Sequence, residues 1–244
     1  MTQKRLLVLY VYHVFQHRVD YFLKHGIFYD PDVDFVIISN DKSNSTQINP
    51  TYANVKTFFR DNVGYDFGGW SEALLTDALY ENYDKFIFVN SSVMGPYVPS
   101  HVVGGKWTDL FLNGLDGRDN VKLFGSTINT IRNPLQMAHV QSYIFAMDKT
   151  TLKYLMECDI FSTSNYAKTF HDAIWQKEVL MSRKVIENGW NIGSFMPLYQ
   201  GVDFTFREKQ PDEYNIEFLD DVMYPAFRNV WWKDEDVVFV KGNR

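Results

Sequence analysis

Residues 60–70 (RDNVGYDFGGW) and residues 86–96 (FIFVNSSVMGP) are the two stretches that decide the fold. At each of them an apolar run of strand character ends in polar side chains and glycines. Parallel α/β sheets present their ligand sites in this way, at the carboxyl ends of the strands. The two stretches together therefore predict an α/β fold with a ligand pocket at one edge of its sheet.

The amino-terminal half alternates strand and helix patterns. Buried strands are predicted at residues 6–12, 34–39, 54–59 and 85–89, and helices at 19–26 and 70–83. Short connections favour a doubly wound layer, in which right-handed crossovers bring all four strand ends to one edge. The side chains expected to converge there are His13, Asn40, Asp41, Arg60, Asp61, Asn62, Asn90, Ser91 and Ser92.

The carboxyl-terminal half has a mixed pattern. Strands are predicted at residues 122–127, 141–146, 190–195, 202–206 and 237–240, and helices at 151–157 and 172–188. No repeat, low-complexity segment or linker interrupts the chain, so we expect residues 1–244 to form a single domain.

Composition limits the class of protein. Of 244 residues, 45% are hydrophobic and 17% aromatic, which is ample for a buried core. The net charge is -6, and no basic cluster of the kind that follows a phosphate backbone is present. Nucleic acid is therefore not an expected partner.

The apolar run at residues 6–12 is too short for the full h-region of a signal peptide or for a membrane span. We therefore expect no membrane span and a cytoplasmic protein. A single cysteine, Cys158, excludes an internal disulfide and suits a reducing compartment. It has no activating partner nearby in sequence, which favours a buried structural thiol over a nucleophile.

The first stretch combines glycines with two charged side chains. Gly64, Gly68 and Gly69 would let the backbone approach a ligand, and main-chain donors at the start of the next helix suit a pyrophosphate. Arg60 can neutralise phosphate, while Asp66 can accept from ribose hydroxyls, hold a cation or cap the helix. The structural alternative is a strand-to-helix turn whose glycines only satisfy backbone geometry.

The second stretch places small polar residues at the end of a buried strand. Asn90, Ser91 and Ser92 would offer oxygen ligands where Mg²⁺ or Mn²⁺ could bridge two phosphates. The alternative is an Asn/Ser turn that satisfies its own backbone.

Four motifs carry a family resemblance. They are R-x-N-x-G-x-D-F-G at residues 60–68, N-S-S-V-x-G-P at 90–96, a helix in which Glu178 is followed by Leu180 and Ser182, and F-x-K-x-N-R at 239–244. This pattern resembles GT-A-type glycosyltransferases of the rhamnan-synthesis class. It is also similar to the amino-terminal glycosyltransferase domain of large chlorella-virus proteins.

The resemblance spans nearly the whole chain and implies a GT-A-like (Rossmann-type) α/β domain with a mixed, mainly parallel sheet flanked by helices. It implies transfer of a sugar from a UDP- or dTDP-linked donor to a hydroxyl of a glycan acceptor. Residues 1–98 would bind the donor and residues 99–244 the acceptor. The implied donor-binding residues are Tyr12, His13, Asp41, Arg60, Asn62, Gly64, Asp66, Asn90 and Ser91.

The resemblance also places residues 90–92 where such enzymes carry an Asp-x-Asp metal motif, and here the chain departs from the pattern. No carboxylate stands in this segment. A Mn²⁺ or Mg²⁺ cofactor would depend on Asp66, Ser92 and the donor phosphates for its ligands. Otherwise the metal would bind weakly or be absent.

Glu178 and Asp172 are the predicted catalytic residues. Both lie on the helix predicted at 172–188, where a solvated charged face is the competing interpretation. His13 and His17 are four residues apart without an evident third ligand, so they do not predict a zinc site. Aromatic side chains of the second half could stack on sugar rings, although core or lid positions are favoured for Trp190, Tyr199, Trp231 and Trp232.

Two other functions compete with glycosyl transfer. A non-catalytic module that binds a sugar nucleotide or a glycan is compatible with the missing Asp-x-Asp motif. A nucleotidyltransferase would need a basic, glycine-rich loop near the amino terminus, and residues 1–20 contain no glycine.

Overall fold

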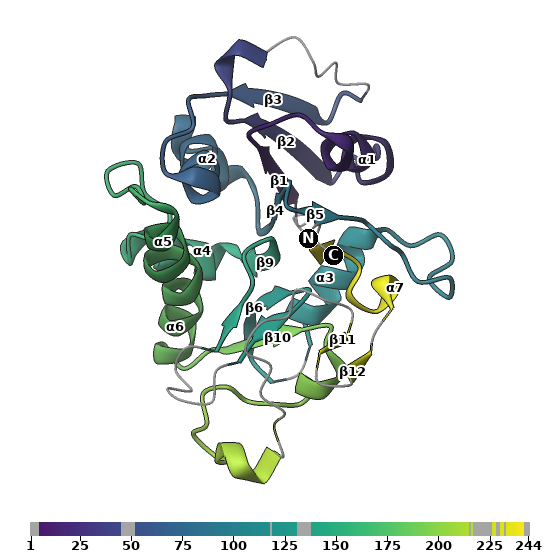
Figure 1. Ribbon diagram of the computed structural model, residues 1–244, viewed down its shortest axis with the longest axis vertical. Coiled ribbons are helices and arrows are strands. Elements are labelled where there is room, and N and C mark those ends of the chain that lie inside the picture. The colour runs from purple at the N-terminus through teal and green to yellow at the C-terminus, as the bar shows by residue number, and fades with distance from the viewer. Residues whose placement is uncertain are drawn as a thin grey trace.

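The computed structural model describes residues 5–44, 52–117, 119–130, 138–214, 216, 226–227, 230–231 and 233–241. Its centre is a seven-stranded sheet in the order β10-β6-β9-β4-β1-β2-β3 (Figure 1). Only β9 runs antiparallel to its neighbours in this sheet, which confirms the predicted mixed, mainly parallel α/β fold. The strands are β1 Leu6–Tyr12, β2 Val33–Ser39, β3 Val55–Phe59, β4 Lys85–Asn90, β6 Val121–Gly125, β9 Ile144–Asp148 and β10 Asn191–Ser194.

Strand β1 shows why the sheet forms the core. All seven of its side chains are buried, as expected for a parallel strand covered on both faces. Its odd-numbered residues 7–11 belong to one apolar cluster and its even-numbered residues 6–12 to another. Because strands from both predicted halves share this sheet, the described residues form a single domain.

Helices cover both faces of the sheet, in two groups that Figure 1 shows on opposite sides. One face carries α2 Tyr65–Leu75, α4 Lys149–Glu157 and α6 Leu180–Glu187, whose apolar residues join the cluster with residues 7–11. The other face carries α1 His17–His25 and α3 Trp107–Leu115. Within the described part of the chain, no helix is both long and apolar enough to cross a membrane.

Shorter elements complete the fold. A π-helical segment, Ala173–Val179, joins α5 Phe170–Asp172 to α6, and α7 spans Asp234–Val237. Short 3₁₀ segments lie at Lys42–Asn44, Thr76–Asn82, Pro197–Tyr199 and Pro211–Tyr214. Three antiparallel strand pairs lie outside the main sheet: β5 Val93–Met94 with β13 Val240–Lys241, β7 Ile128–Asn129 with β8 His139–Val140, and β11 Ala226–Phe227 with β12 Val230–Trp231.

The helix predicted at residues 70–83 needs correction. It begins earlier, at Tyr65, and ends at Leu75, where a 3₁₀ segment with positive φ at Asp77 and Ala78 takes over. Gly68 and Gly69 therefore lie inside the helix, not in a ligand-binding turn. A Cβ on Gly69 would come within 2.9 Å of Val11 Cγ2, so the glycine lets α2 pack closely against the sheet.

Two strand predictions in the second half are wrong. Residues 202–206 form a turn whose backbone is bound by a side chain: Asn191 Nδ2 donates to Val202 O, and Phe204 N donates to Asn191 Oδ1. The apolar alternation came from Val202 and Phe204, which are buried without a strand partner. Residues 237–240 divide between the end of α7 and the start of β13.

The helix predicted at residues 172–188 is confirmed in extent, since helical structure runs from Phe170 to Glu187. Gly189 ends it with φ +79, the left-handed conformation expected after a helix. Cys158, the expected buried thiol, is only partly buried at the end of α4.

Candidate active site

Two polar clusters lie at the carboxyl edge of strands β1 to β4. The first, here called the Arg60 cluster, comprises Asn40, Arg60, Asn62, Glu72 and Tyr166. Asn40 is its hub, because its Oδ1 accepts from Arg60 Nη1 at 2.8 Å and its Nδ2 lies 3.3 Å from Asn62 Oδ1. The predicted convergence of polar residues after β2 and β3 is therefore confirmed.

Arg60 is enclosed by this cluster. Its Nη2 donates to Val63 O at 2.6 Å and to Glu72 Oε1 at 2.7 Å, and only 3% of the residue is exposed. Tyr166 donates to the same Glu72 oxygen. The hydrogen bond from Arg60 is the main reason that the pKa of Glu72 lies below its usual value. In this arrangement Arg60 presents no face to a nucleotide.

Gly64 also has a structural role here. It precedes α2 with φ +75, and a Cβ at this position would come within 2.5 Å of the Tyr166 ring. The glycine is therefore needed for the turn and for the packing of Tyr166. The geometric alternative considered for the glycine-rich stretch accounts for Gly64 as well as for Gly68 and Gly69.

The second cluster surrounds a cavity of 210 Å³, here called the Asp66 cavity. It brings together four of the predicted site residues, Asp66, Asn90, Ser92 and Glu178. They come from α2, β4, the segment after β4 and the π-helical segment, respectively. The remaining described lining residues are Tyr65, Phe67, Ser142, Tyr143, Phe170, Ala173, Ile174 and Lys241.

Asp66 faces the cavity from the first turn of α2. It does not cap the helix, because Gly64 occupies the N-cap position and no side chain caps this end. Instead its Oδ2 accepts from Asn90 Nδ2 at 2.9 Å. Burial raises the pKa of Asp66 to about 6, and Glu178 adds to the rise while Asn90 and Lys241 oppose it.

Asn90 links Asp66 to the polar segment that follows β4. Its Oδ1 accepts from the backbone nitrogen of Ser92 at 2.9 Å and from Ser92 Oγ at 2.6 Å. Ser91 is held through its backbone, with its nitrogen donating to Val11 O and its carbonyl accepting from Arg18 Nε. The segment is thus the self-satisfying turn considered above, and it also fixes the Asp66 carboxylate.

Glu178 is the second carboxylate of the cavity. Its Oε2 accepts from the backbone nitrogen of Ser142 at 2.8 Å and from Ser142 Oγ, and its Oε1 lies 3.4 Å from His139 Nε2. Burial alone would raise the pKa of Glu178, but the contacts with His139 and Ser142 lower it overall. The solvated-face interpretation is therefore wrong for Glu178, whose side chain is only 16% exposed and has both carboxylate oxygens engaged.

The π-helical segment gives two consecutive residues different anchors. Lys177 donates from its buried ammonium to Asp159 O at 2.5 Å and to Asn165 O at 2.7 Å. Glu178, the next residue, turns to Ser142 and the cavity. Short π segments are common at functional sites because they reorient side chains within a helix.

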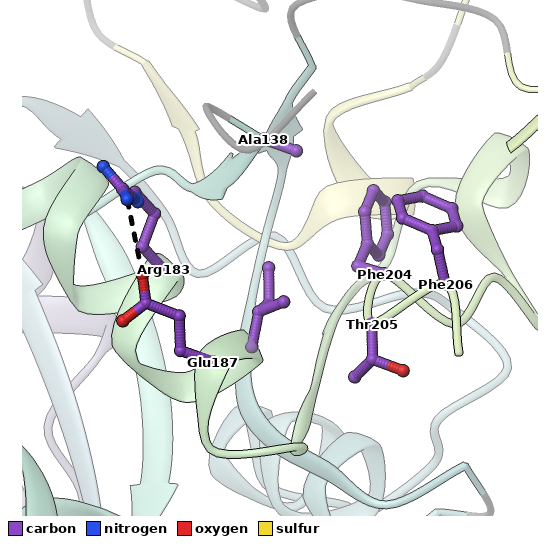
Figure 2. A pocket seen from close by; sticks show the side chains of 7 residues that line it. Ala138, Arg183, Glu187, Phe204, Thr205 and Phe206 are labelled. Carbon is purple, nitrogen blue, oxygen red and sulfur yellow. Dashed lines mark hydrogen bonds and ion pairs between the residues drawn. The ribbon is translucent and has the colours of Figure 1, made fainter. Parts of the chain in front are cut away.

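A second cavity, of 240 Å³, lies between α6 and residues 204–206 (Figure 2). Arg183 and Glu187 on α6 pair with each other at 3.3 Å, and Phe204 and Phe206 lie across from the helix. None of the predicted site residues lines it. The Asp66 cavity is therefore the candidate active site.

A sequence model of the family described as Rhamnan synthesis protein F matches residues 35–215, which is most of the chain. The chain belongs to this family. Membership confirms the predicted rhamnan-synthesis class and supports glycosyltransferase activity in polysaccharide biosynthesis. A comparison with curated protein sequences finds no match.

The part matched by the rhamnan synthesis protein F family contains most of the Asp66 cavity. Asp66, Asn90, Ser92 and Glu178 all lie within residues 35–215, whereas Lys241 lies beyond them. Asn243 and Arg244 of the carboxyl-terminal motif are outside the described residues.

Asp172, the other predicted catalytic residue, lies outside the cavity lining of this family member. It forms a capping box, in which its nitrogen donates to Thr169 Oγ1 at 3.1 Å and its Oδ2 accepts from Thr169 N at 3.0 Å. Gln176 Nε2 donates to its other oxygen. Its contacts are thus those of a helix start.

Three of the donor-binding residues implied by the resemblance, Tyr12, His13 and Asp41, lie at or just after the ends of β1 and β2, where they were expected to border the nucleobase. Tyr12 is fully buried, and burial raises the pKa of its hydroxyl. Asp41 Oδ1 accepts from Ser43 N at 2.9 Å and from Ser43 Oγ at 2.5 Å. His13 and Asn62 are exposed, and His13 Nδ1 lies 3.0 Å from Asn40 O. Among the implied donor-binding residues outside the Asp66 cavity, His13 and Asn62 offer the most accessible side chains.

The predicted metal ligands do not form a preformed site. Across the residues described, no three His, Cys, Asp or Glu side chains gather to hold an ion. Asp66 and Ser92 are both hydrogen-bonded to Asn90, and Glu178 is bonded to Ser142 and His139. Among the described residues, these side chains therefore form no metal site of their own.

Sequence reasoning missed His139, Ser142 and Lys241 as members of the site. His139 belongs to β8 and Ser142 lies just before β9. In the sequence, His139 comes just before the strand predicted at 141–146 and Ser142 lies within it, and nothing else marks either residue. Lys241 belongs to the motif at 239–244, but nothing in the sequence indicated its pairing with β5. Trp231, proposed as core or lid, has a described backbone only, and Trp232 is outside the described residues.

Proposed function

We propose that this chain is a GT-A-type glycosyltransferase that moves a sugar from a nucleoside diphosphate donor to a hydroxyl of a glycan acceptor. The observation that carries the proposal is the meeting of Asp66, Asn90, Ser92 and Glu178 in one cavity at the carboxyl edge of the sheet. Open α/β sheets bind ligands at this edge. Membership in a rhamnan synthesis family supports polysaccharide biosynthesis as the setting.

The donor would lie along the carboxyl edge of β1 to β4. His13 and Asn62 are exposed next to Asn40 and are suited to contact the base and ribose. Ser91 and Ser92 follow β4, where the diphosphate would lie, and the sugar would enter the Asp66 cavity. A UDP- or dTDP-linked donor is expected from the family resemblance.

The two carboxylates differ in how many of their oxygens remain available to accept a hydrogen bond from a ligand. Both oxygens of Glu178 are engaged by Ser142 and His139, so its negative charge is fixed beside the sugar. Asp66 uses only Oδ2, toward Asn90, and no other described residue binds Oδ1. We therefore assign Asp66 as the group that accepts the proton of the attacking hydroxyl and Glu178 as the group that stabilises positive charge on the sugar ring.

The proposed reaction consumes one donor and one acceptor hydroxyl. The hydroxyl oxygen forms a bond to the anomeric carbon, and the bond between that carbon and the diphosphate oxygen breaks. The electron pair of the broken bond leaves with the nucleoside diphosphate, and the hydroxyl proton moves to Asp66. A pKa of about 6 keeps Asp66 deprotonated at neutral pH and close enough to the operating pH to exchange a proton.

Nucleotide release distinguishes an enzyme from a binding module. Purified protein is incubated with UDP- and dTDP-linked sugars, including dTDP-rhamnose, and free nucleoside diphosphate is measured over time. Slow donor hydrolysis, accelerated by a glycan acceptor, is the expected result. Binding of a donor without any release, with or without candidate acceptors, would leave the non-catalytic module as the better account.

A further inference from the structure

Lys241 brings a positive charge into a cavity that otherwise holds two carboxylates. Asp66 and Glu178 would repel a donor diphosphate unless a cation stood beside them. The sequence predicted a divalent metal for this task, yet the described residues do not form a site for one. Among the described lining residues, Lys241 is the only one with a permanently charged cationic side chain near neutral pH.

The position of Lys241 follows from the pairing of β13 with β5. In this antiparallel pair Lys241 lies opposite Val93, the residue that follows Ser92. The side chain lines the same cavity as Asn90 and Ser92, and its ammonium lies 5.8 Å from the centre of the Tyr143 ring. The lysine is thus next to the segment where the diphosphate would lie.

The segment before Lys241 is held firmly by the core. Phe239 is fully buried and packs edge-to-face on Trp107, with ring centres 5.1 Å apart. Tyr97 N donates to Val238 O at 2.7 Å. A Cβ on Gly95 would come within 2.5 Å of the Phe239 ring, so the glycine makes room for it. These contacts place the Lys241 backbone before any ligand arrives.

Unlike several lysines of the protein, Lys241 forms no ion pair among the described residues. Lys85, Lys106 and Lys122 are each paired with an aspartate, whereas no ion pair joins Lys241 to a carboxylate among the described residues. The other basic side chain near this segment, Arg18, donates to the Ser91 carbonyl and does not line the cavity. The ammonium of Lys241 therefore remains available for an anionic ligand.

We propose that Lys241 binds the diphosphate of the sugar nucleotide in place of a divalent metal and stabilises the negative charge of the departing nucleoside diphosphate. This assignment rests on the proposed function. The step is the one balanced above: the electron pair of the broken bond goes to the diphosphate oxygen, and the ammonium donates hydrogen bonds to it without transferring a proton.

The test is calorimetric titration with UDP, dTDP, GDP and ADP, in EDTA and again in Mn²⁺. The variants are Lys241→Gln, Lys241→Arg and the control Lys233→Gln, which removes an exposed lysine of the same carboxyl-terminal segment. We expect wild type to bind at least one diphosphate in EDTA. Lys241→Gln should weaken that binding at least tenfold, while Lys241→Arg stays within about threefold of wild type and Lys233→Gln matches it.

The matching nucleoside without phosphates should bind wild type and Lys241→Gln equally, which separates loss of the phosphate contact from a folding defect. Unchanged diphosphate binding by Lys241→Gln would overturn the assignment of Lys241 and leave the proposed function standing. Diphosphate binding that requires Mn²⁺ would also overturn this assignment, because a metal ion and not Lys241 would then be the main partner of the diphosphate. If wild type binds none of the four diphosphates in either condition, both proposals fail.

Discussion

The Arg60 cluster and the Asp66 cavity both contain charged and amide side chains at the same edge of the sheet, yet they differ in the hydrogen-bonding capacity that remains for a ligand. In the Arg60 cluster the guanidinium is enclosed by Asn40, Val63 O and Glu72. In the Asp66 cavity one carboxylate keeps a free oxygen, and Lys241 has no acidic partner among the described residues.

The difference shows that a charged side chain at a sheet edge is not by itself a ligand contact. A buried charge that is hydrogen-bonded to several protein groups stabilises the local fold and resists being drawn out, because its partners would be left unpaired. A charge with unused capacity beside a cavity is the better candidate for chemistry. Substitutions in the two regions test this division.

Asp66→Asn should lower turnover by about a hundredfold or more, since general acid–base catalysis contributes roughly 10²–10⁴. The amide keeps the size of the side chain and can still accept from Asn90, so the fold should persist. Steady-state release of nucleotide from the donor measures the effect. Asp61→Asn, which changes an exposed aspartate nearby, is the control and should retain wild-type turnover. Wild-type turnover in Asp66→Asn would remove Asp66 from the reaction.

Arg60→Met should destabilise the protein by about 2–3 kcal/mol, because it leaves Glu72 and Asn40 without their main hydrogen-bond partner. Chemical denaturation measures the free energy of unfolding. Lys42→Gln is the matched control, since it breaks an exposed ion pair with Asp61 and should cost less than about 1 kcal/mol. A stable Arg60→Met protein that no longer binds donor would instead support the nucleotide contact implied by the family resemblance.

The free energy of unfolding should depend on pH through Asp66. Because the folded-state pKa is raised to about 6 from 3.8, protonation stabilises the folded state. This contribution is fully present below pH 3.8 and is lost as the pH rises through about 6. At pH 7 Asp66→Asn should therefore be more stable than wild type, by about 1–2 kcal/mol since water reaches the side chain from the cavity. Denaturation of both proteins at pH 4 and pH 7 measures the difference, and a gap that is the same at both would contradict the raised pKa.

Asp172→Ala should have the smallest effect. Loss of the capping box with Thr169 should cost about 0.5–1 kcal/mol of unfolding free energy, with turnover within twofold of wild type. Thermal denaturation and the nucleotide-release assay measure the two quantities. A tenfold loss of turnover at unchanged stability would show that Asp172 takes part in catalysis, as the sequence predicted.

The sequence was sufficient for the first four strands and for part of the site. The apolar runs at residues 6–12 and 85–89 each predict a buried parallel strand, and parallel strands end at the same edge. The approach of Asp66 to Asn90 follows from that topology. The sequence could not predict that Arg60 is buried. An arginine that follows a strand looks the same in the sequence whether it faces solvent or pairs with Glu72.

The second half of the site depends on contacts between distant residues. Glu178 meets Ser142 across 36 positions of sequence, and Lys241 reaches the cavity only because β13 pairs with β5. Neither contact produces a periodic pattern in the sequence from which it could be predicted. The false strand at 202–206 has a similar cause, because two backbone hydrogen bonds of that segment are made with the distant Asn191 side chain and not with a neighbouring strand.

The π-helical segment Ala173–Val179 has a consequence for how the family can vary. Its wider turn lets Lys177 hold the carbonyls of Asp159 and Asn165 while the next residue reaches Ser142. Removing one residue would tighten the segment toward an α-helix and rotate one of these two side chains away from its anchor. Among related chains, substitutions within 173–179 should therefore be tolerated more readily than insertions or deletions. The length of this segment should vary less than its amino-acid sequence.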